Sequence, residues 1–223
     1  DSAANYYTVL ENNAEYKSHI ILARTMKMRS YSKLENHEKS IKAARALILT
    51  EKITEETLAE AHLTIGKAAL KMDSIALAQT EFEMTYKISP SSESGAEAKY
   101  NSAYIYYLLK DFTLSEKIIF EIINQIPSYD YWIAKSFILL SDVYMNNGNN
   151  MQAKATLQSI IDNYDGSDLI TLAHEKLNAI LQSEKVEEPS KTEEDIQIEF
   201  ENDTEKDQLF NENNKSEEGN KNE

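Results

Sequence analysis

Four histidines are the residues of this chain best suited to metal binding or proton transfer, since cysteine is absent. They are His19, His37, His62 and His174, and no two of them stand in the His-x-x-x-His or Glu-x-x-His pattern that places ligands on one helix face. The chain also lacks a Gly-x-Ser-x-Gly turn and a phosphate-binding glycine loop. We therefore interpret each histidine as an ordinary helix residue, and we expect no catalytic residue, no metal site and no cofactor.

A row of tyrosines offers a different chemistry, the recognition of another protein. Tyr100, Tyr104 and Tyr107 are spaced i, i+4, i+7, so they share one face if the segment is helical. Tyrosine combines rigid apolar area with a hydrogen-bonding hydroxyl, and it is favoured in recognition surfaces. The same spacing is equally compatible with tyrosines that pack between neighbouring helices. Tyr106 is out of phase with this face, and we expect it in the core.

The residues around the tyrosines predict helices in pairs. A chain of 223 residues with only five glycines and three prolines suits a helical fold. Apolar residues recur at helical spacing in residues 132–145 and again in residues 151–164, and Asn147-Gly148 lies between the two segments. Asparagine and glycine tolerate positive φ, so the first helix can end there and the chain can turn back into the second. The result is an antiparallel helix pair.

This pair repeats with a period of 37 or 38 residues. Pro90 and Pro127 each close an apolar segment, and Asp165 takes the matching position one period later. Small residues recur at Gly66, Ala103 and Ser141 and at Ser40, Ala78, Ser115 and Ala153, and large apolar residues follow the second set at Phe82, Ile119 and Leu157. Small side chains let two helices approach closely where they cross. A pair of this length must stack on its neighbours to bury its apolar face, which predicts an α-solenoid.

The repeated pattern resembles the tetratricopeptide repeat. That motif has a small and then an aromatic residue in its first helix, an alanine and then a bulky residue in its second, and a proline afterwards. Residues 59–90, 96–127 and 134–165 carry the pattern, and a weaker copy spans about residues 21–52. The matching residues are Gly66, Ala78, Phe82 and Pro90; Ala103, Tyr106 and Pro127; and Leu140, Tyr144, Gly148, Ala153 and Leu157. The resemblance implies an all-α fold, a right-handed α-solenoid of stacked antiparallel helix pairs.

The whole chain divides into a helical solenoid and a tail. Residues 2–12 are interpreted as a helix remaining from a preceding repeat, and residues 168–182 as a capping helix. The predicted solenoid therefore occupies residues 1–182. Residues 183–223 form an acidic tail that we expect to be disordered, since it has few apolar residues to bury. Because the chain opens with Asp1 and an unpaired helix, we expect it to be the C-terminal end of a longer array.

In tetratricopeptide proteins, the first helix of each repeat lines a concave groove that binds protein segments. Helical phase places the tyrosine row there, with residues of the two neighbouring repeats. The predicted groove residues are Leu63, Lys67, Leu70, Lys71, Tyr100, Tyr104, Tyr107, Leu108, Ile138, Asp142 and Met145. Some members of the family clamp an acidic C-terminal peptide with basic side chains from this groove. Here the corresponding positions include Glu60, Glu97 and Asp142, so we exclude that ligand for the groove. Trp132 is expected to seal a junction between repeats.

Charge excludes two classes of partner. The formal net charge is −15; residues 183–223 hold 15 acidic residues and five lysines, a net charge of −10, so residues 1–182 carry −5. Phosphate backbones and anionic lipids repel such a chain, so we expect no nucleic acid and no membrane surface among its partners. No apolar run approaches the roughly 18 residues that a membrane span requires, so we expect no direct membrane insertion.

Two functions remain open. The leading one is a non-enzymatic scaffold whose groove binds a segment of a protein partner within a larger assembly. The alternative is a rigid spacer or oligomerising strut whose acidic tail makes the interaction. In the tail, Ile196, Ile198 and Phe200 alternate with polar residues, which suits a strand added to a partner's sheet. A solvated linker is the favoured interpretation of that segment, because short alternation is common in biased sequence.

A longer resemblance concerns location. The segment "AKYNSAYIYYLLKDFTLSEKIIFEIINQIPSYDYWIAKSFILLSDVY", followed by "QAKATLQSIIDNY", resembles the C-terminal part of long tetratricopeptide proteins found in the cell envelope of Bacteroidetes-type bacteria. The similarity covers roughly residues 15–182. It implies an exported scaffold, periplasmic or associated with the outer membrane, and a cytoplasmic location is the alternative.

Overall fold

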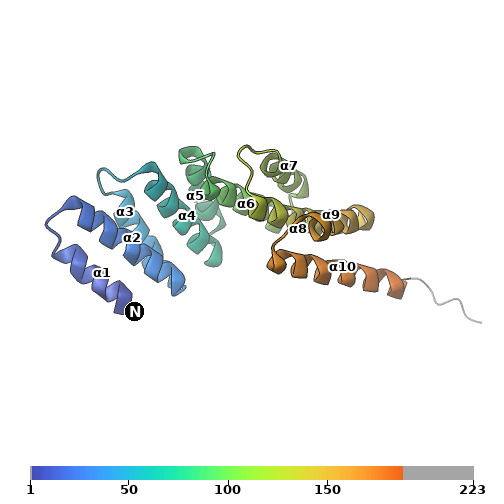
Figure 1. Ribbon diagram of the computed structural model, residues 1–223, viewed down its shortest axis with the longest axis horizontal. Helices are drawn as coiled ribbons and strands as arrows, with labels where there is room; N and C mark the ends of the chain where they lie inside the picture. Colours follow the sequence, from blue (N-terminus) through green and yellow to red (C-terminus); the bar gives the residue numbers. More distant parts are fainter. Residues whose placement is uncertain (1, 188–223) are drawn as a thin grey trace, which may run out of the picture. The chain divides into compact units, whose positions relative to one another are not determined.

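The structure, a computed structural model, describes residues 2–187 and the side chains of residues 2–184. Within this range it contains ten α-helices and no strand (Figure 1). The helices are α1 (Ser2–Asn12), α2 (Lys17–Lys33), α3 (His37–Ile48), α4 (Glu55–Lys71), α5 (Ile75–Ile88), α6 (Glu93–Leu108), α7 (Phe112–Ile123), α8 (Asp130–Asn146), α9 (Asn150–Asn163) and α10 (Ser167–Glu187). The described residues up to Asn178 form one compact unit. Among the described residues, no helix combines the length and the apolarity that crossing a membrane requires.

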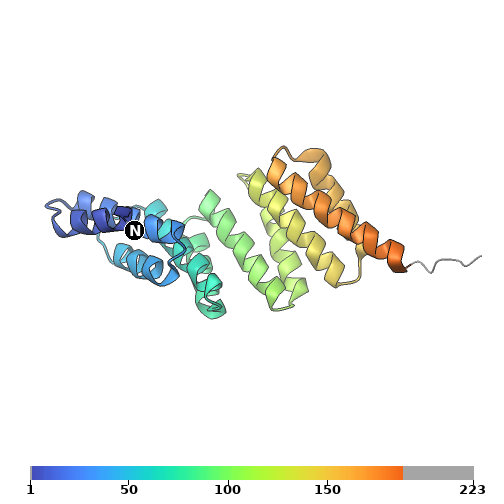
Figure 2. The same cartoon turned by 90° about the horizontal axis from the view of Figure 1, so that it is seen from below.

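Helices α2 to α9 form four antiparallel pairs that stack in the order of the sequence. Each second helix packs against its own first helix and the first helix of the next pair: α3 contacts α2 and α4, and α5 contacts α4 and α6. First helices also contact one another directly, and Figure 1 and Figure 2 show α6 and α8 side by side. The structure thus confirms an all-α solenoid of stacked antiparallel helix pairs.

Each first helix begins ahead of the corresponding predicted repeat. The first residues of these helices are Lys17, Glu55, Glu93 and Asp130. Capping explains two of these starts, because the Thr54 and Ser92 hydroxyls accept hydrogen bonds from the backbone N–H groups of Thr57 and Gly95. The repeat motif begins inside the helix, so boundaries drawn from it omit the first turn. The division into residues 1–182 and a tail stays a prediction, since residues 188–223 lie outside the described range.

Small residues hold the two helices of a pair close together, as the sequence predicts. Gly66 on α4 faces Phe82 on α5, and a Cβ added to this glycine would lie 2.7 Å from Phe82 Cε1. In the next pair, the Ser115 hydroxyl on α7 donates to the Ala103 carbonyl on α6 at 2.9 Å. Such contacts require two backbones to approach with no large side chain between them. The large side chains that follow, those of Phe82, Ile119 and Leu157, are fully buried.

The turn inside each pair places one residue in the left-handed region. Gly148 follows α8 with φ of +73°, and the equivalent residues are Glu35 at 53°, Asp73 at 58° and Lys110 at 61°. The next residue of each turn donates its backbone N–H to a carbonyl five residues back, as Asn149 does to Tyr144 at 2.8 Å. This is the Schellman arrangement that ends many helices. Asn147 keeps a φ of −88°, so only the glycine of the Asn147-Gly148 pair uses positive φ.

Substitutions at the positive-φ residues of two of these turns should change the free energy of unfolding in opposite directions. Replacing Gly148 by Ala puts a Cβ in the left-handed region and should lower the free energy of unfolding by about 1 kcal/mol. Lys110→Gly removes that strain and should raise it by up to about 1 kcal/mol. Urea denaturation followed by circular dichroism measures both changes. Equal destabilisation by the two substitutions would show that the turns are not equivalent.

An ion-pair network fixes α1 to the first pair. The Glu11 carboxylate accepts a hydrogen bond from Arg24 Nε at 2.8 Å and one from Lys27 Nζ. Arg24 also donates through Nη1 to the Ala46 carbonyl at 2.9 Å and to Thr50 Oγ1 at 2.8 Å, so it links α1, α2 and the end of α3. Burial raises the pKa of Glu11, but the hydrogen bonds from Lys27 and Arg24 outweigh burial and hold the pKa below its usual range.

This depressed pKa predicts a specific acid sensitivity. A carboxyl group with a lower pKa in the folded state stabilises the protein above its unfolded pKa, and the contribution disappears as pH falls through the folded pKa. Between about pH 5 and pH 3, the wild type should therefore lose more unfolding free energy than Glu11→Gln. Denaturation curves across this range test the difference, with the exposed Glu15→Gln as control. Parallel pH profiles for wild type and Glu11→Gln would contradict the role of Glu11.

Candidate functional site

A row of polar contacts links each first helix to the next over the predicted groove. We call these four contacts the first-helix ladder, with α10 in the position of a fifth first helix. They are Arg29–Glu60 between α2 and α4 at 2.6 and 2.7 Å, Lys67–Glu97 between α4 and α6 at 2.6 Å, Asn146–Tyr107 between α8 and α6 at 3.2 Å, and Lys176–Asp142 between α10 and α8 at 2.6 Å. Three of the four are ion pairs, and the Arg29–Glu60 pair is bidentate.

The first two ion pairs of the ladder share a geometry in which the carboxylate lies deeper than the cation. The Glu97 side chain is 17% exposed and that of Lys67 is 53% exposed, and Glu60 and Arg29 differ in the same sense. Each cation therefore extends from one helix across a less exposed carboxylate on the neighbouring helix. Exposed pairs of this kind contribute at most about 1 kcal/mol each, the bidentate arginine pair being the best placed. Their main consequence is to neutralise this part of the groove.

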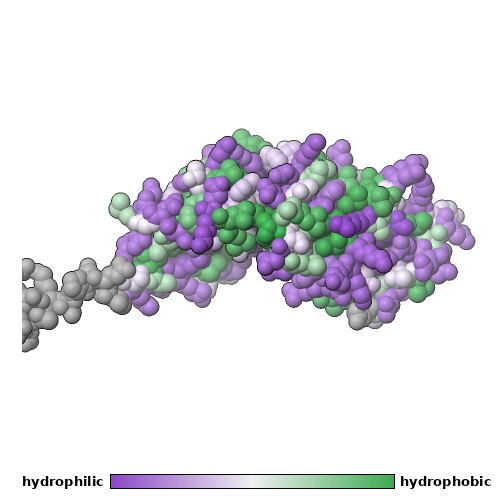
Figure 3. Space-filling model, turned by 180° about the vertical axis from the view of Figure 1, so that it is seen from behind, coloured by the Kyte–Doolittle hydropathy of each residue, from purple (hydrophilic) through white to green (hydrophobic). Residues whose placement is uncertain are grey.

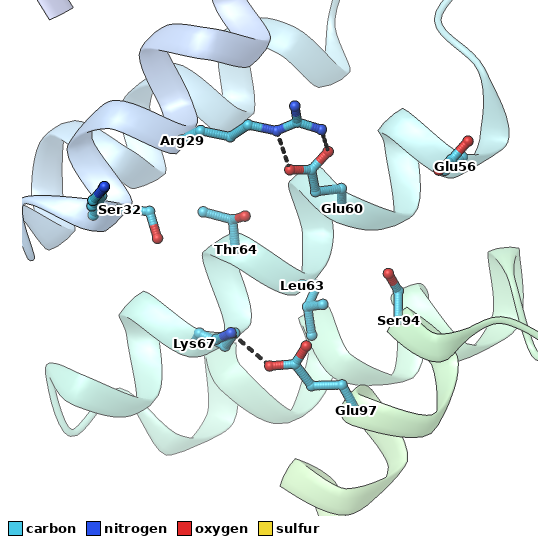
Figure 4. Close-up of a pocket in the computed structure, with 10 residues that line it drawn as sticks. Arg29, Ser32, Glu56, Glu60, Leu63, Thr64, Lys67, Ser94 and Glu97 are labelled. Carbon is cyan, nitrogen blue, oxygen red and sulfur yellow. Dashed lines mark hydrogen bonds and ion pairs between the residues drawn. The ribbon is translucent and has the colours of Figure 1, made fainter. Parts of the chain in front are cut away.

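A cavity of about 510 Å³ opens over these two ion pairs, between α2, α4 and α6. Figure 4 shows Arg29 turned toward Glu60 and Lys67 turned toward Glu97 on its wall. The charged residues that line it are three cations and three carboxylates: Arg29, Lys33, Lys67, Glu56, Glu60 and Glu97. Lys33 and Glu56 stand outside the two ladder pairs. The cavity is polar, and its charged side chains balance.

The tyrosine row lies next along the first helices, between α6 and α8. The rings of Tyr104 and Tyr107 are stacked with centroids 6.3 Å apart, and Tyr100 lies 5.5 Å from the Trp132 ring. All three tyrosines are half-buried and pack against the core cluster that contains Leu139 and other α8 residues. Burial raises the pKa of the Tyr100 phenol, so this ring stays neutral. The row therefore packs between helices and still keeps part of its surface open.

Trp132 anchors the start of α8 under this row. It is 7% exposed, and the Tyr131 ring meets it edge-on at 5.0 Å. The Lys135 ammonium lies 5.0 Å from the ring centroids of both Tyr100 and Trp132. Cations in this position are attracted by the ring faces. The indole is thus enclosed by α6 and α8, in keeping with its expected role of sealing a junction.

The predicted groove residues fall into four environments: ladder contacts, nearly complete burial, half-burial and exposure. Lys67 and Asp142 are held in ladder ion pairs, and Tyr107 is bound to Asn146. Leu63 and Ile138 are each 6% exposed, so little of either side chain is open to a partner. Leu70 and Met145 are half-buried, whereas Lys71 and Leu108 are exposed. Their assignment as partner contacts stays a prediction, and the tail residues Ile196, Ile198 and Phe200 lie outside the described range.

The sequence did not reveal that charged residues of neighbouring first helices pair in a ladder. It placed Lys67, Glu97 and Asp142 along the groove as separate charges, and it did not pair them. A usable pattern is present, because residues of opposite charge recur about 30 to 34 residues apart on successive first helices, a little less than one repeat. Pairing across neighbouring helices depends on the stacking geometry, which the period alone does not give.

One histidine, His62, is paired with a carboxylate. His62 Nδ1 on α4 lies 2.6 Å from Glu81 Oε2 on α5, and both side chains are largely buried inside one helix pair. In the part of the chain that the structure describes, no group of three or more His, Cys, Asp or Glu side chains could hold a metal ion. Figure 3 shows instead a mixed surface on which apolar residues gather near the middle of one face, among hydrophilic ones.

One segment of the sequence matches a family model. Residues 130–167, which comprise α8, α9 and the start of α10, match the tetratricopeptide repeat model. No curated protein sequence is significantly similar to the chain. The family match therefore identifies one repeat from sequence, and the other helix pairs are related to it by structure.

Solved structures of tetratricopeptide type share the fold. BtubC from P. vanneervenii matches with a TM-score of 0.63 and 14% identity, over 82% of this chain and 81% of that one. A tetratricopeptide repeat protein from Parabacteroides merdae matches with a TM-score of 0.61 and 16% identity, over 82% and 66%. MamA matches with a TM-score of 0.57 and 13% identity, over 71% and 85%. At these identities the likeness shows the fold alone. Proteins built from such repeats generally mediate protein–protein interactions and are typically non-catalytic scaffolds.

Proposed function

We propose that this protein is a non-enzymatic scaffold that binds an extended segment of a protein partner along its first helices. The observation that carries the proposal is a continuous change of chemistry along α2, α4, α6 and α8. A polar cavity of about 510 Å³ over the first two ladder pairs is followed by the half-buried tyrosine row. Cavities of this size accommodate several side chains of a bound segment.

The two halves of this surface favour different side chains of the segment. The cavity walls are already neutralised by the Arg29–Glu60 and Lys67–Glu97 pairs, so a strongly charged segment gains little there. Polar side chains and backbone amides can bond to the ladder groups. The tyrosine row offers apolar area with hydroxyl groups, and rings held by packing lose little entropy on binding. We therefore expect a partner segment with a polar part and an apolar part.

A charge placed at the exposed edge of this surface should abolish binding without unfolding the protein. Lys71 and Leu108 are exposed, so Lys71→Glu/Leu108→Glu should keep the helical fold. Binding of the segment would then remove water from the new carboxylates, which opposes binding. In crosslinked capture from a native lysate, the amount of specific partner recovered should fall tenfold or more. The matched control is Lys87→Glu/Leu49→Glu, which makes the same changes at exposed positions outside the first helices.

Three results would distinguish binding by the groove from the alternative, in which the solenoid is a spacer and the tail binds the partner. Loss of capture in the groove variant alone supports the groove. Loss in both variants indicates a non-specific effect of charge and counts against it. Deletion of residues 188–223 should leave capture intact; if capture disappears with that deletion and survives Lys71→Glu/Leu108→Glu, the tail is the interacting element.

We further propose that the scaffold works in the cell envelope, as part of a larger assembly. The support is the resemblance of residues 15–182 to envelope-associated tetratricopeptide proteins. Fractionation of the native cells should find the protein in the periplasmic or outer-membrane fraction, with a cytoplasmic enzyme as the fractionation control. Recovery with the cytoplasmic marker would contradict the location and leave the groove proposal standing.

A further inference from the structure

A second surface lies away from the first-helix groove, in the crevice between α1 and α3. This α1–α3 crevice has a volume of about 440 Å³, and its floor is formed by α2. The helix α2 contributes Lys27 and Tyr31 to this crevice, whereas it contributes Arg29 and Lys33 to the groove cavity. The two sites thus use different side chains of one helix.

The repeated architecture supplies an internal reference for this crevice. The crevice between α5 and α7, two repeats further on, has a volume of about 200 Å³. A shift of 75 residues carries six lining positions of the first crevice onto six of the second. The pairs are Thr8 and Glu83, Glu11 and Tyr86, Lys27 and Ser102, Tyr31 and Tyr106, Ala43 and Ile118, and Ala46 and Glu121. The side chains at these six positions can therefore be compared directly between the two crevices.

These substitutions make the α1–α3 crevice both larger and more basic. Ala43 stands where Ile118 fills the second crevice, which accounts for part of the greater volume. Ala46 and Thr8 stand where the second crevice has glutamates. The charged residues that line the α1–α3 crevice are Lys27, Lys39 and Lys42 against Glu11, a net charge of +2. The α5–α7 crevice has Lys99 against Glu83 and Glu121, a net charge of −1.

The carboxylate that lines the α1–α3 crevice does not neutralise all of its lysines. Glu11 is already bonded to Arg24 and Lys27. Among the described residues, neither Lys39 nor Lys42 takes part in an ion pair, and Lys39 Nζ lies 5.5 Å from the Tyr31 ring centroid. In the α5–α7 crevice, by contrast, Lys99 is paired with Glu121 at 3.1 Å. Two lysines are thus available at the mouth of a cavity in a chain whose net charge is −15.

We propose that the α1–α3 crevice binds an acidic segment of a protein partner. Lys39 and Lys42 are one helical turn apart, so each can bind a different carboxylate of that segment. The volume lies within the range of ligand sites and is far larger than a single inorganic anion needs. The Tyr31 ring on the floor of the crevice, and Ala43 and Ala46 on its α3 wall, offer the segment apolar contacts. The net negative charge of the chain repels acidic segments from the rest of its surface. An acidic segment is therefore directed to this crevice.

The test uses the full chain of residues 1–223 and a fluorescein-labelled peptide of alternating aspartate and glutamate, followed by fluorescence anisotropy at low salt. Lys39→Gln/Lys42→Gln should weaken binding at least about fivefold. The matched control, Lys87→Gln/Lys117→Gln, removes two exposed lysines from α5 and α7, and Lys117 is the repeat equivalent of Lys42. A second variant, Ala46→Glu, introduces the carboxylate that the α5–α7 crevice carries, and it should weaken binding at least as much.

Each other outcome overturns the inference. Equal binding by wild type and Lys39→Gln/Lys42→Gln, or equal weakening by the control, would mean that the crevice is not the site. Displacement of the peptide by inorganic phosphate at equal concentration would mean that the site takes small anions. The groove variant Lys71→Glu/Leu108→Glu should bind the peptide as the wild type does, apart from a small general charge effect. Its selective failure would place the peptide in the groove, so the two proposals can fail independently.

Discussion

The close crossing of two helices inside each pair is the constraint on which the rest of this structure depends. Gly66 admits the Phe82 ring where any side chain would collide with it, and Ser115 reaches the Ala103 carbonyl across the next pair. With the two helices this close, the second helix is left in position to contact the next first helix as well. Stacking, the row of first helices and the crevices between second helices all follow from that spacing.

The first helices carry two kinds of contact with different roles. Aromatic packing of the half-buried Tyr100 on the buried Trp132 joins α6 to α8, whereas the ion pairs at Glu60 and Glu97 lie near solvent. Near-surface ion pairs add little free energy, but they fix which side chains face one another. A binding surface made in this way has a preset charge pattern, and a partner meets groups that are already ordered.

The repeat, the helix pairs and the fold class could be predicted from this sequence because they depend on local residue types and on period. Proline and small residues at a fixed interval report the turns and the crossings directly. Side-chain partners could not be predicted in the same way. The sequence predicts Lys67 in the groove, but whether its ammonium group contacts a partner or Glu97 depends on how far one helix pair is rotated against the next. The same uncertainty applied to Ile138, whose side chain the stacking buries. Likewise Ala43, an unremarkable helix residue in the sequence, becomes informative only when Ile118 is found at the equivalent position.

The ladder contacts and the contacts of the second helices all join one helix pair to the pair next to it. No described helix pair contacts the pair after next. The unfolding of a terminal pair therefore removes one interface and leaves the others unchanged, so resistance to local opening should rise from the ends of the unit toward α4, α5 and α6. Mechanical load along the array would likewise pass through the interfaces in series, and the weakest single interface would set the force at which the stack parts.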